Sequence, residues 1–163
     1  MIQIFITGGT FDKSYNYKDG NLFFEKTHLP EMLKRSKSQL DVEIETLMMI
    51  DSLEMKPSDI KKIISNCKNS KKNKIVITHG TDTMVNTAKA LANEKIDKTI
   101  ILTGAMIPYA FGSSSDGFFN LGCALSYVQT LQNGVYITMH GQYFKWDEVV
   151  KNSEKGYFEK IKT

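Results

Sequence analysis

The chain has 163 residues, 41% hydrophobic and 24% charged, so it is long enough for one globular domain with an ordinary core. Its net charge of +3 does not indicate a nucleic-acid-binding protein, and the lysine-rich stretch 56–74 lacks the interleaved aromatic residues that would support one. No run approaches the ~20 apolar residues of a membrane span, so we expect no membrane partner.

The two cysteines, Cys67 and Cys123, lie in apolar helical patterns and are too few for a disulfide framework. No cysteine and histidine cluster has metal-ligand spacing, so we expect no metal. The glycine turns match neither the dinucleotide fingerprint nor the phosphate loop, so we expect no cofactor. The first residues form a strand pattern rather than a signal peptide, which predicts a reduced, cytoplasmic protein.

Strand and helix patterns alternate along the chain. Short runs rich in Val, Ile and Leu predict strands at residues 2–6, 42–49, 74–78, 99–103 and 134–139. Apolar residues at helical spacing predict helices at residues 30–36, 57–69, 82–93 and 116–131, the last with Phe118, Leu121, Leu125 and Val128 facing inward. Two polar stretches predict loop: residues 8–20, and most of the chain beyond residue 140.

This alternation predicts a single α/β domain over residues 1–163. We expect three layers, with a mostly parallel sheet of about five strands and helices on both faces, as in Rossmann and flavodoxin-like folds. The sequence contains no internal repeat and no linker that would divide this domain.

Two predicted strands end in glycine turns that present threonine, at residues 6–10 and 76–84. In an open parallel sheet, ligands bind in the crevice beyond the carboxyl ends of the strands. The two turns would place hydroxyls, one carboxylate and free backbone N–H groups in that crevice. These groups can attack a carbonyl and stabilise the resulting oxyanion, so the pattern predicts an enzyme.

Six ordered segments carry a family resemblance: Thr-Gly-Gly-Thr at 7–10, Asp-Ser-Leu-Glu-Met at 51–55, His-Gly-Thr-Asp-Thr-Met at 79–84, Thr-Gly-Ala-Met at 103–106, Ser-Asp-Gly at 115–117 with Phe-Asn-Leu at 119–121, and 134–152 ending in Val-Val-Lys-Asn. Together they resemble the bacterial-type L-asparaginases, which are amidohydrolases with a threonine nucleophile. The matches span nearly the whole chain. The implied reaction is hydrolysis of the L-asparagine side-chain amide to L-aspartate and ammonia through an acyl-threonine intermediate.

The resemblance places the nucleophilic threonine at Thr10. Without the other segments, a threonine in this position would more simply stabilise its own turn. Tyr15 resembles the family tyrosine that polarises or deprotonates this hydroxyl, and Tyr17 is the rival candidate.

The resemblance also implies a second catalytic group formed by Thr81, Asp82 and Lys151. An alcohol is a poor nucleophile until a base accepts its proton, so we expect Lys151 to shuttle protons in contact with Thr81. Asp82 could also accept the substrate α-ammonium. Asp82 could instead cap the following helix, and Lys151 could be one more solvated lysine.

The matched segments include the residues that the resemblance assigns to the substrate. Ser52 resembles the residue that holds the substrate α-carboxylate, beside the backbone of Gly80 and Thr81. Ala105 resembles the residue whose carbonyl meets the substrate amide nitrogen. Gly9 and Asp51 are assigned to the same site, and the N–H groups of Thr10 and Thr81 would hold the oxyanion.

The chain departs from the family pattern in two respects. Family enzymes usually carry a second, smaller domain that lends an acidic residue to a neighbouring subunit, and short one-domain relatives resemble this chain more closely. Leu53 stands where the larger enzymes usually carry glutamine. A loop or a second copy would then have to supply the missing acidic contact, and we expect a homodimer because ligand sites favour interfaces.

Other functions remain open at this point. L-glutamine or another small amide could be the substrate, and the domain could bind amino acids with weak or no catalysis. Ammonia release for a tRNA-dependent amidotransferase would need a partner and an extra domain. A nucleotide-binding module is disfavoured because the phosphate loop is missing.

Overall fold

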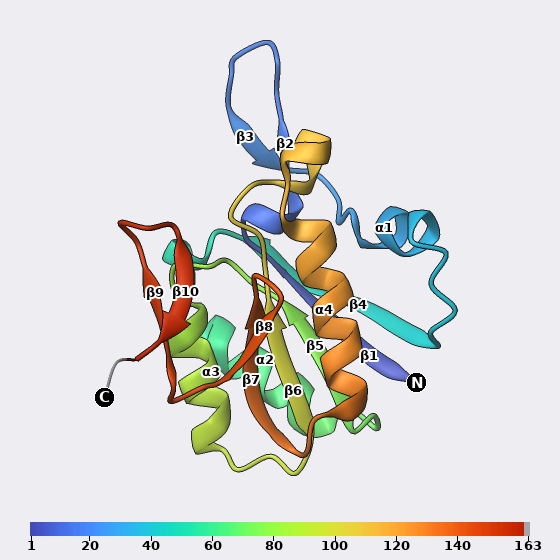
Figure 1. Cartoon of the computed structure of the whole chain (residues 1–163), viewed down its shortest axis with the longest axis vertical. Helices are drawn as coiled ribbons and strands as arrows, with labels where there is room; N and C mark the ends of the chain where they lie inside the picture. The colour runs from blue at the N-terminus through green and yellow to red at the C-terminus, as the bar shows by residue number, and fades with distance from the viewer. Residues whose placement is uncertain (162–163) are drawn as a thin grey trace.

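The computed structural model describes residues 1–161, and its centre is a six-stranded sheet in the order β4-β1-β5-β6-β7-β8 (Figure 1). The first five strands in this order are parallel, and β8 runs antiparallel to β7. The mostly parallel α/β sheet is therefore confirmed, with β8 as an additional strand. The strands are β1 Ile2–Gly8, β4 Val42–Ile50, β5 Lys74–Thr78, β6 Thr99–Thr103, β7 Gly134–Met139 and β8 Gln142–Lys145.

Helices cover both faces of the sheet, because alternate residues of each strand point to opposite sides. On β1, Phe5 packs into the core under α2 and α3, whereas Ile4 and Ile6 pack into the core under α1 and α4. The helices are α1 Leu29–Arg35, α2 Pro57–Asn69, α3 Met84–Asn93 and α4 Gly117–Thr130, and the 3-10 turns are η1 Thr10–Asp12, η2 Ser52–Glu54 and η3 Tyr109–Ser114.

The prediction that the chain beyond residue 140 is mostly loop is wrong. This part forms β8 and a separate hairpin of β9 Val149–Asn152 and β10 Tyr157–Lys160. Each of these strands is four residues long and buries few large side chains, among them Phe144, Val149 and Phe158. Such short, half-exposed strands have too little apolar alternation to be distinguished from loop.

The segment 8–20 also contains more structure than predicted. After η1 it enters a hairpin of β2 Lys13–Tyr15 and β3 Leu22–Phe24, which projects from the body of the molecule (Figure 1). Tyr15, Tyr17 and Leu22 are exposed on this hairpin. The polar tip between the strands accounts for the loop prediction.

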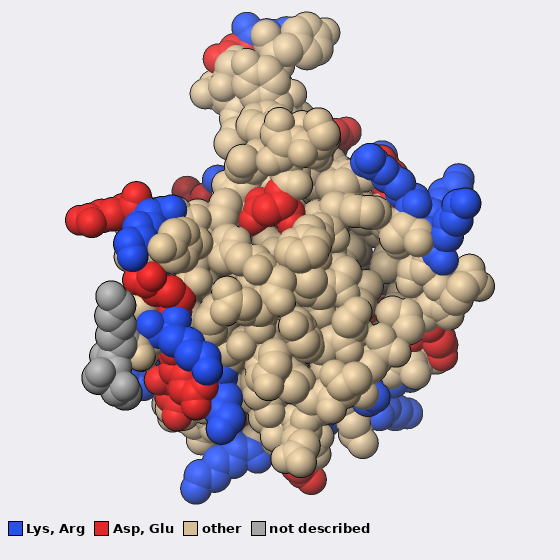
Figure 2. All heavy atoms as spheres, viewed as in Figure 1, with Lys and Arg blue, Asp and Glu red and all other residues tan. Residues whose placement is uncertain are grey.

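Helix α4 lies on the face of the molecule seen in Figures 1 and 2 and contains no charged residue. Leu121, Leu125 and Val128 are buried as predicted, but Phe118 is 36% exposed rather than inward. Figure 2 shows that charged side chains gather toward the two sides of this face and leave its centre almost uncharged. Within residues 1–161, no helix has the length and apolar character needed to cross a bilayer.

Candidate active site

Three strand ends meet at one point because glycines allow their backbones to touch. Gly9 has a positive φ of 77°, and a Cβ atom there would overlap the backbone of Gly80. A Cβ atom on Gly80 would lie 2.5 Å from Ser52 Oγ. The segments that follow β1, β4 and β5 are therefore in direct contact, and they carry Thr10, Ser52 and Thr81 to the same edge of the sheet.

Lys151 reaches this edge from the β9–β10 hairpin. Its Nζ donates a hydrogen bond to Thr81 Oγ1 over 2.9 Å and forms an ion pair with Asp82 Oδ1 over 2.5 Å. The lysine side chain is 15% exposed, so its stem is covered while its ammonium contacts both partners. The hydroxyl, ammonium and carboxylate predicted to act together are thus in contact, although Lys151 is 70 residues from Thr81 in sequence.

The Asp82 carboxylate does not cap the helix that follows it. Helix α3 begins at Met84, two residues later than the predicted start, and its N-terminus has no side-chain cap. Asp82 instead faces the Lys151 ammonium. This pairing favours a role in the site over the capping role.

His79 supports the same turn from within the core and was not predicted as a site residue. Its ring is fully buried, and burial lowers the pKa of His79 to about 4, although a hydrogen bond to the Gly80 carbonyl opposes this shift. The neutral ring must donate from Nδ1 to that carbonyl over 2.7 Å, so Nε2 accepts from the Thr87 hydroxyl over 2.9 Å. These two bonds link the turn to α3.

The Ser52 hydroxyl is buried and has no hydrogen-bond partner among the described residues. The Ser52 carbonyl accepts a bond from Thr83 Oγ1 over 3.0 Å, which ties the β4 turn to the β5 turn. A buried hydroxyl without a partner carries a desolvation cost unless a ligand satisfies it. Ser52 is therefore available to a bound polar group.

Asp51, beside Ser52, forms an ion pair with Lys13 over 2.5 Å and accepts a hydrogen bond from the Leu53 N–H. The hydrogen bond from Lys13 is the main reason why the pKa of Asp51 lies below its ordinary value, and the Lys151 charge adds to this effect. Lys13 is a site-lining residue that the sequence analysis missed. A polar residue three positions after Thr10 carried no local signal for this contact.

Ala105 belongs to the same edge of the sheet. It follows β6 closely and is fully buried. A Cβ atom on the preceding Gly104 would lie 3.5 Å from Thr81 Cγ2, so the β6 turn lies against the β5 turn. Among the described residues, nothing donates a hydrogen bond to the Ala105 carbonyl.

Thr10 and Tyr15, the first pair of predicted catalytic residues, are not in hydrogen-bond contact in the structure. Within residues 1–161, the hydroxyls of Thr10 and Tyr15 make no hydrogen bond to each other. Tyr15 lies on β2, is 50% exposed, and its ring packs edge-on against Phe111. Tyr17, the rival candidate, is 82% exposed.

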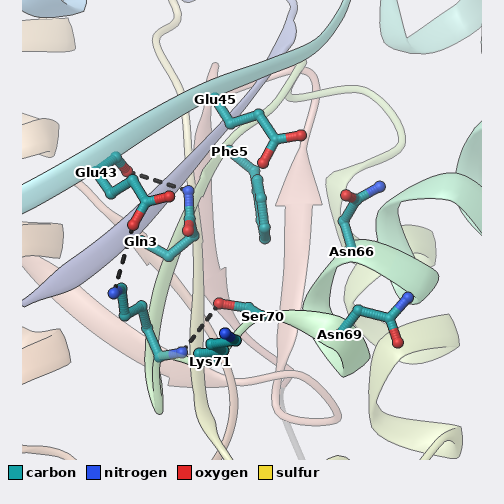
Figure 3. Close-up of a pocket in the computed structure, with 9 residues that line it drawn as sticks. Gln3, Phe5, Glu43, Glu45, Asn66, Asn69, Ser70 and Lys71 are labelled. Atoms are coloured by element: carbon teal, nitrogen blue, oxygen red, sulfur yellow. Dashed lines mark hydrogen bonds and ion pairs between the residues drawn. The ribbon is translucent and has the colours of Figure 1, made fainter.

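A separate polar cavity of about 240 Å³ lies against β1 and β4 on the α2 side of the sheet (Figure 3). It contains none of the predicted site residues, and its lining includes Gln3, Glu43, Glu45 and Asn66. Among the described residues, this cavity included, no group of three or more His, Cys, Asp or Glu side chains is arranged to hold a metal ion. The threonine, lysine and carboxylate cluster lies instead at the carboxyl edge of the parallel strands.

The fold and this edge define an α/β domain with a threonine, lysine and carboxylate cluster beyond its parallel strands. Residues 1–158 match the family model described as Asparaginase, N-terminal. The chain therefore belongs to the asparaginase family, through its N-terminal domain.

Known relatives are similar over most of this chain. A component of the glutamyl-tRNA(Gln) amidotransferase of Thermococcus kodakarensis is 32% identical over 148 residues, which is 86% of this chain and 33% of that protein. L-asparaginase 1 of Escherichia coli is 30% identical over 166 residues, which is 96% of this chain and 48% of that protein. The chain thus spans between one third and one half of these relatives.

Solved structures share the fold. The thermostable L-asparaginase from Thermococcus kodakarensis superposes with a TM-score of 0.85 at 24% identity, over 98% of this chain and 51% of that one. The probable cytoplasmic L-asparaginase from Campylobacter jejuni superposes with a TM-score of 0.79 at 28% identity, over 92% of this chain and 49% of that one. Each likeness covers about half of the larger chain.

Proposed function

We propose that this domain hydrolyses the side-chain amide of L-asparagine to L-aspartate and ammonia. The observation that carries the proposal is the contact of Lys151 with both Thr81 and Asp82. A lysine held between a hydroxyl and a carboxylate can deliver a proton and take one back, as amide cleavage requires. Membership in the asparaginase family supports the same substrate class.

The first half of the proposed reaction forms an ester. The Thr10 hydroxyl oxygen attacks the amide carbon, and the backbone N–H groups of Thr10 and Thr81 hold the oxyanion. The Thr10 proton passes through the Thr81 and Lys151 network to the amide nitrogen. The C–N bond then breaks, ammonia leaves, and the acyl group remains on Thr10.

The second half uses water. Water attacks the acyl carbon, its proton enters the same network, and the ester bond to Thr10 breaks. L-aspartate leaves and the Thr10 hydroxyl regains its proton. The sum is amide plus water giving acid plus ammonia.

The substrate would be held by its α-substituents. The unpartnered Ser52 hydroxyl is suited to donate to the α-carboxylate beside the Gly80 backbone. Asp82 keeps one carboxylate oxygen outside its contact with Lys151, and this oxygen can accept the α-ammonium. Tyr15 would have to move inward to act on Thr10, because in this conformation it is half exposed and makes no hydrogen bond to the Thr10 hydroxyl.

The test is ammonia release from L-asparagine, with L-glutamine alongside, by the wild-type chain and the variants Thr10→Ala, Thr81→Ala and Lys151→Met. We expect turnover that each substitution reduces at least a hundredfold, with Lys61→Met, a lysine on the exposed side of α2, as the matched control. Binding of asparagine without turnover would instead favour the amino-acid-binding function. Turnover that survives in all three variants would contradict the threonine mechanism.

We also propose that two copies associate through the α4 face. This face is almost uncharged at its centre and exposes Phe119, so a second copy could approach with little like-charge repulsion. Light scattering at micromolar concentration would show twice the monomer mass, and Phe119→Asp would return the monomer. A wild-type monomer at high concentration would refute this arrangement.

A further inference from the structure

Residues 115–120 carry part of the family resemblance but take no part in the reaction steps proposed above. They lead into α4 and form its first turn, and their side chains surround the turn that carries Ala105. Side-chain hydrogen bonds hold this turn at both of its ends. These bonds fix the conformation of the backbone around Ala105.

Both carboxylate oxygens of Asp116 accept hydrogen bonds from backbone N–H groups of the turn. Oδ1 accepts from Met106 N over 2.9 Å and from Ile107 N over 3.0 Å, and Oδ2 lies 3.0 Å from Met106 N. Ser115 Oγ donates to the Ile107 carbonyl over 2.7 Å. The turn is therefore held at its far end by the two consecutive residues that precede α4.

Asn120 holds the near end of the turn. It is fully buried, and its Nδ2 donates to the Gly104 carbonyl over 3.0 Å and to Asp116 Oδ2 over 2.8 Å. Its Oδ1 accepts a hydrogen bond from His140 N over 3.0 Å, so both polar atoms of the Asn120 side chain are hydrogen-bonded. This bond also ties the β7–β8 turn to the group.

These contacts surround Ala105, but its carbonyl oxygen does not take part in them. A Cβ atom on Gly117 would lie 3.3 Å from Ala105 Cβ, so the first turn of α4 lies directly against this residue. The carbonyls of Thr103, Gly104 and Ile107 each accept a hydrogen bond, from His79, Asn120 and Ser115. Among the described residues, the Ala105 carbonyl accepts none.

We infer that Ser115, Asp116 and Asn120 are positioning residues that aim the Ala105 carbonyl at the amide nitrogen of the substrate. The inference rests on the proposed amidase function. The Ala105 carbonyl would then discriminate between leaving groups. An amide nitrogen can donate an N–H to this carbonyl, both before cleavage and as departing ammonia, whereas an ester oxygen cannot.

Comparing an amide with an ester substrate separates a positioning effect from general destabilisation, which would lower activity on both. The β-methyl ester of L-aspartate would form the same acyl-threonine, with a C–O bond breaking and methanol leaving instead of ammonia. The value of kcat/KM reports the steps up to acylation for both substrates. A misdirected Ala105 carbonyl would therefore slow the amide reaction and spare the ester reaction.

The main variant is Asp116→Asn, which places an NH2 group where the native carboxylate accepts from Met106 and Asn120. We expect kcat/KM for L-asparagine to fall at least tenfold and kcat/KM for the ester to change less than twofold. Asp147→Asn, which alters an aspartate on the β8–β9 connection, is the matched control and should leave both values unchanged. Circular dichroism confirms that each variant is folded.

Ser115→Ala is the second variant and removes the bond to the Ile107 carbonyl. It should lower the ratio of amide to ester kcat/KM about threefold. If Asp116→Asn does not fold, Ser115→Ala alone tests the positioning role. An equal fall for both substrates, or no fall for the amide, would overturn the positioning role while the proposed function stands. A wild-type chain that cleaves neither substrate would refute the proposed function and this inference together.

Discussion

The buried histidine beneath the β5 turn makes the stability of this domain depend on pH. His79 has a pKa lowered to about 4 in the folded chain, mainly by burial, against an ordinary value of 6.5. The unfolded chain therefore binds more protons than the folded chain between these two values, so stability falls as the pH falls. The contribution of His79 is fully present above pH 6.5.

The magnitude follows from the two values. At about 1.4 kcal/mol for each pH unit between them, the free energy of unfolding should lose about 2 kcal/mol by pH 5 and about 3 kcal/mol by pH 4. Other groups titrate in the same range. The loss must therefore be measured relative to a variant that keeps the hydrogen bonds without titrating.

His79→Gln is that variant, because its side chain can donate to the Gly80 carbonyl and accept from the Thr87 hydroxyl. Urea unfolding from pH 7.5 to 4.5, followed by circular dichroism, gives the stability of both proteins. We expect the wild type to lose about 2 kcal/mol more of its free energy of unfolding than the variant does between pH 7.5 and 5. A difference that stays constant with pH would refute the assignment of a buried, neutral His79.

Three further predictions concern packing and thiol exposure. Gly80→Ala would force a Cβ atom to 2.5 Å from Ser52 Oγ and should destabilise the domain by about 1–3 kcal/mol, with recovery in the double variant that adds Ser52→Gly, measured by urea unfolding. Phe158→Ala should cost about 3–5 kcal/mol in the same assay if β10 is part of the core, whereas a loop phenylalanine would cost almost nothing. Cys67 is fully buried with a pKa raised by burial to about 12, so a disulfide reagent at pH 8 should label only Cys123 in the native protein and both thiols in urea. Rapid native labelling of two thiols would contradict this burial.

Much of the architecture could be predicted because it depends on local pattern. The parallel strands are buried on both faces, so β5 and β6 appear as continuous apolar runs whose bounds agree with prediction. Helix α2 also agrees at both ends, since proline begins it and a polar segment follows it. The glycine turns marked the strand ends that meet at the candidate site, because close backbone contact leaves no space for a side chain.

The late strands could not be predicted in the same way. β7 and β8 are joined by His140 and Gly141, both with positive φ, and a His-Gly pair is not a common hairpin signal. β9 and β10 are stabilised by burying Val149 and Phe158 against residues far away in the chain. Their existence depends on that packing and not on local propensity.

The sequence by itself determined the class of domain and placed the threonine turns at the carboxyl ends of the parallel strands, because each depends on residues that are neighbours in the chain. Only the tertiary structure decided which side chains meet there. The contacts of Lys151 with Thr81, and of Lys13 with Asp51, join residues 70 and 38 positions apart. Such contacts arise from how strands and hairpins pack around the core, and no local pattern encodes that distance.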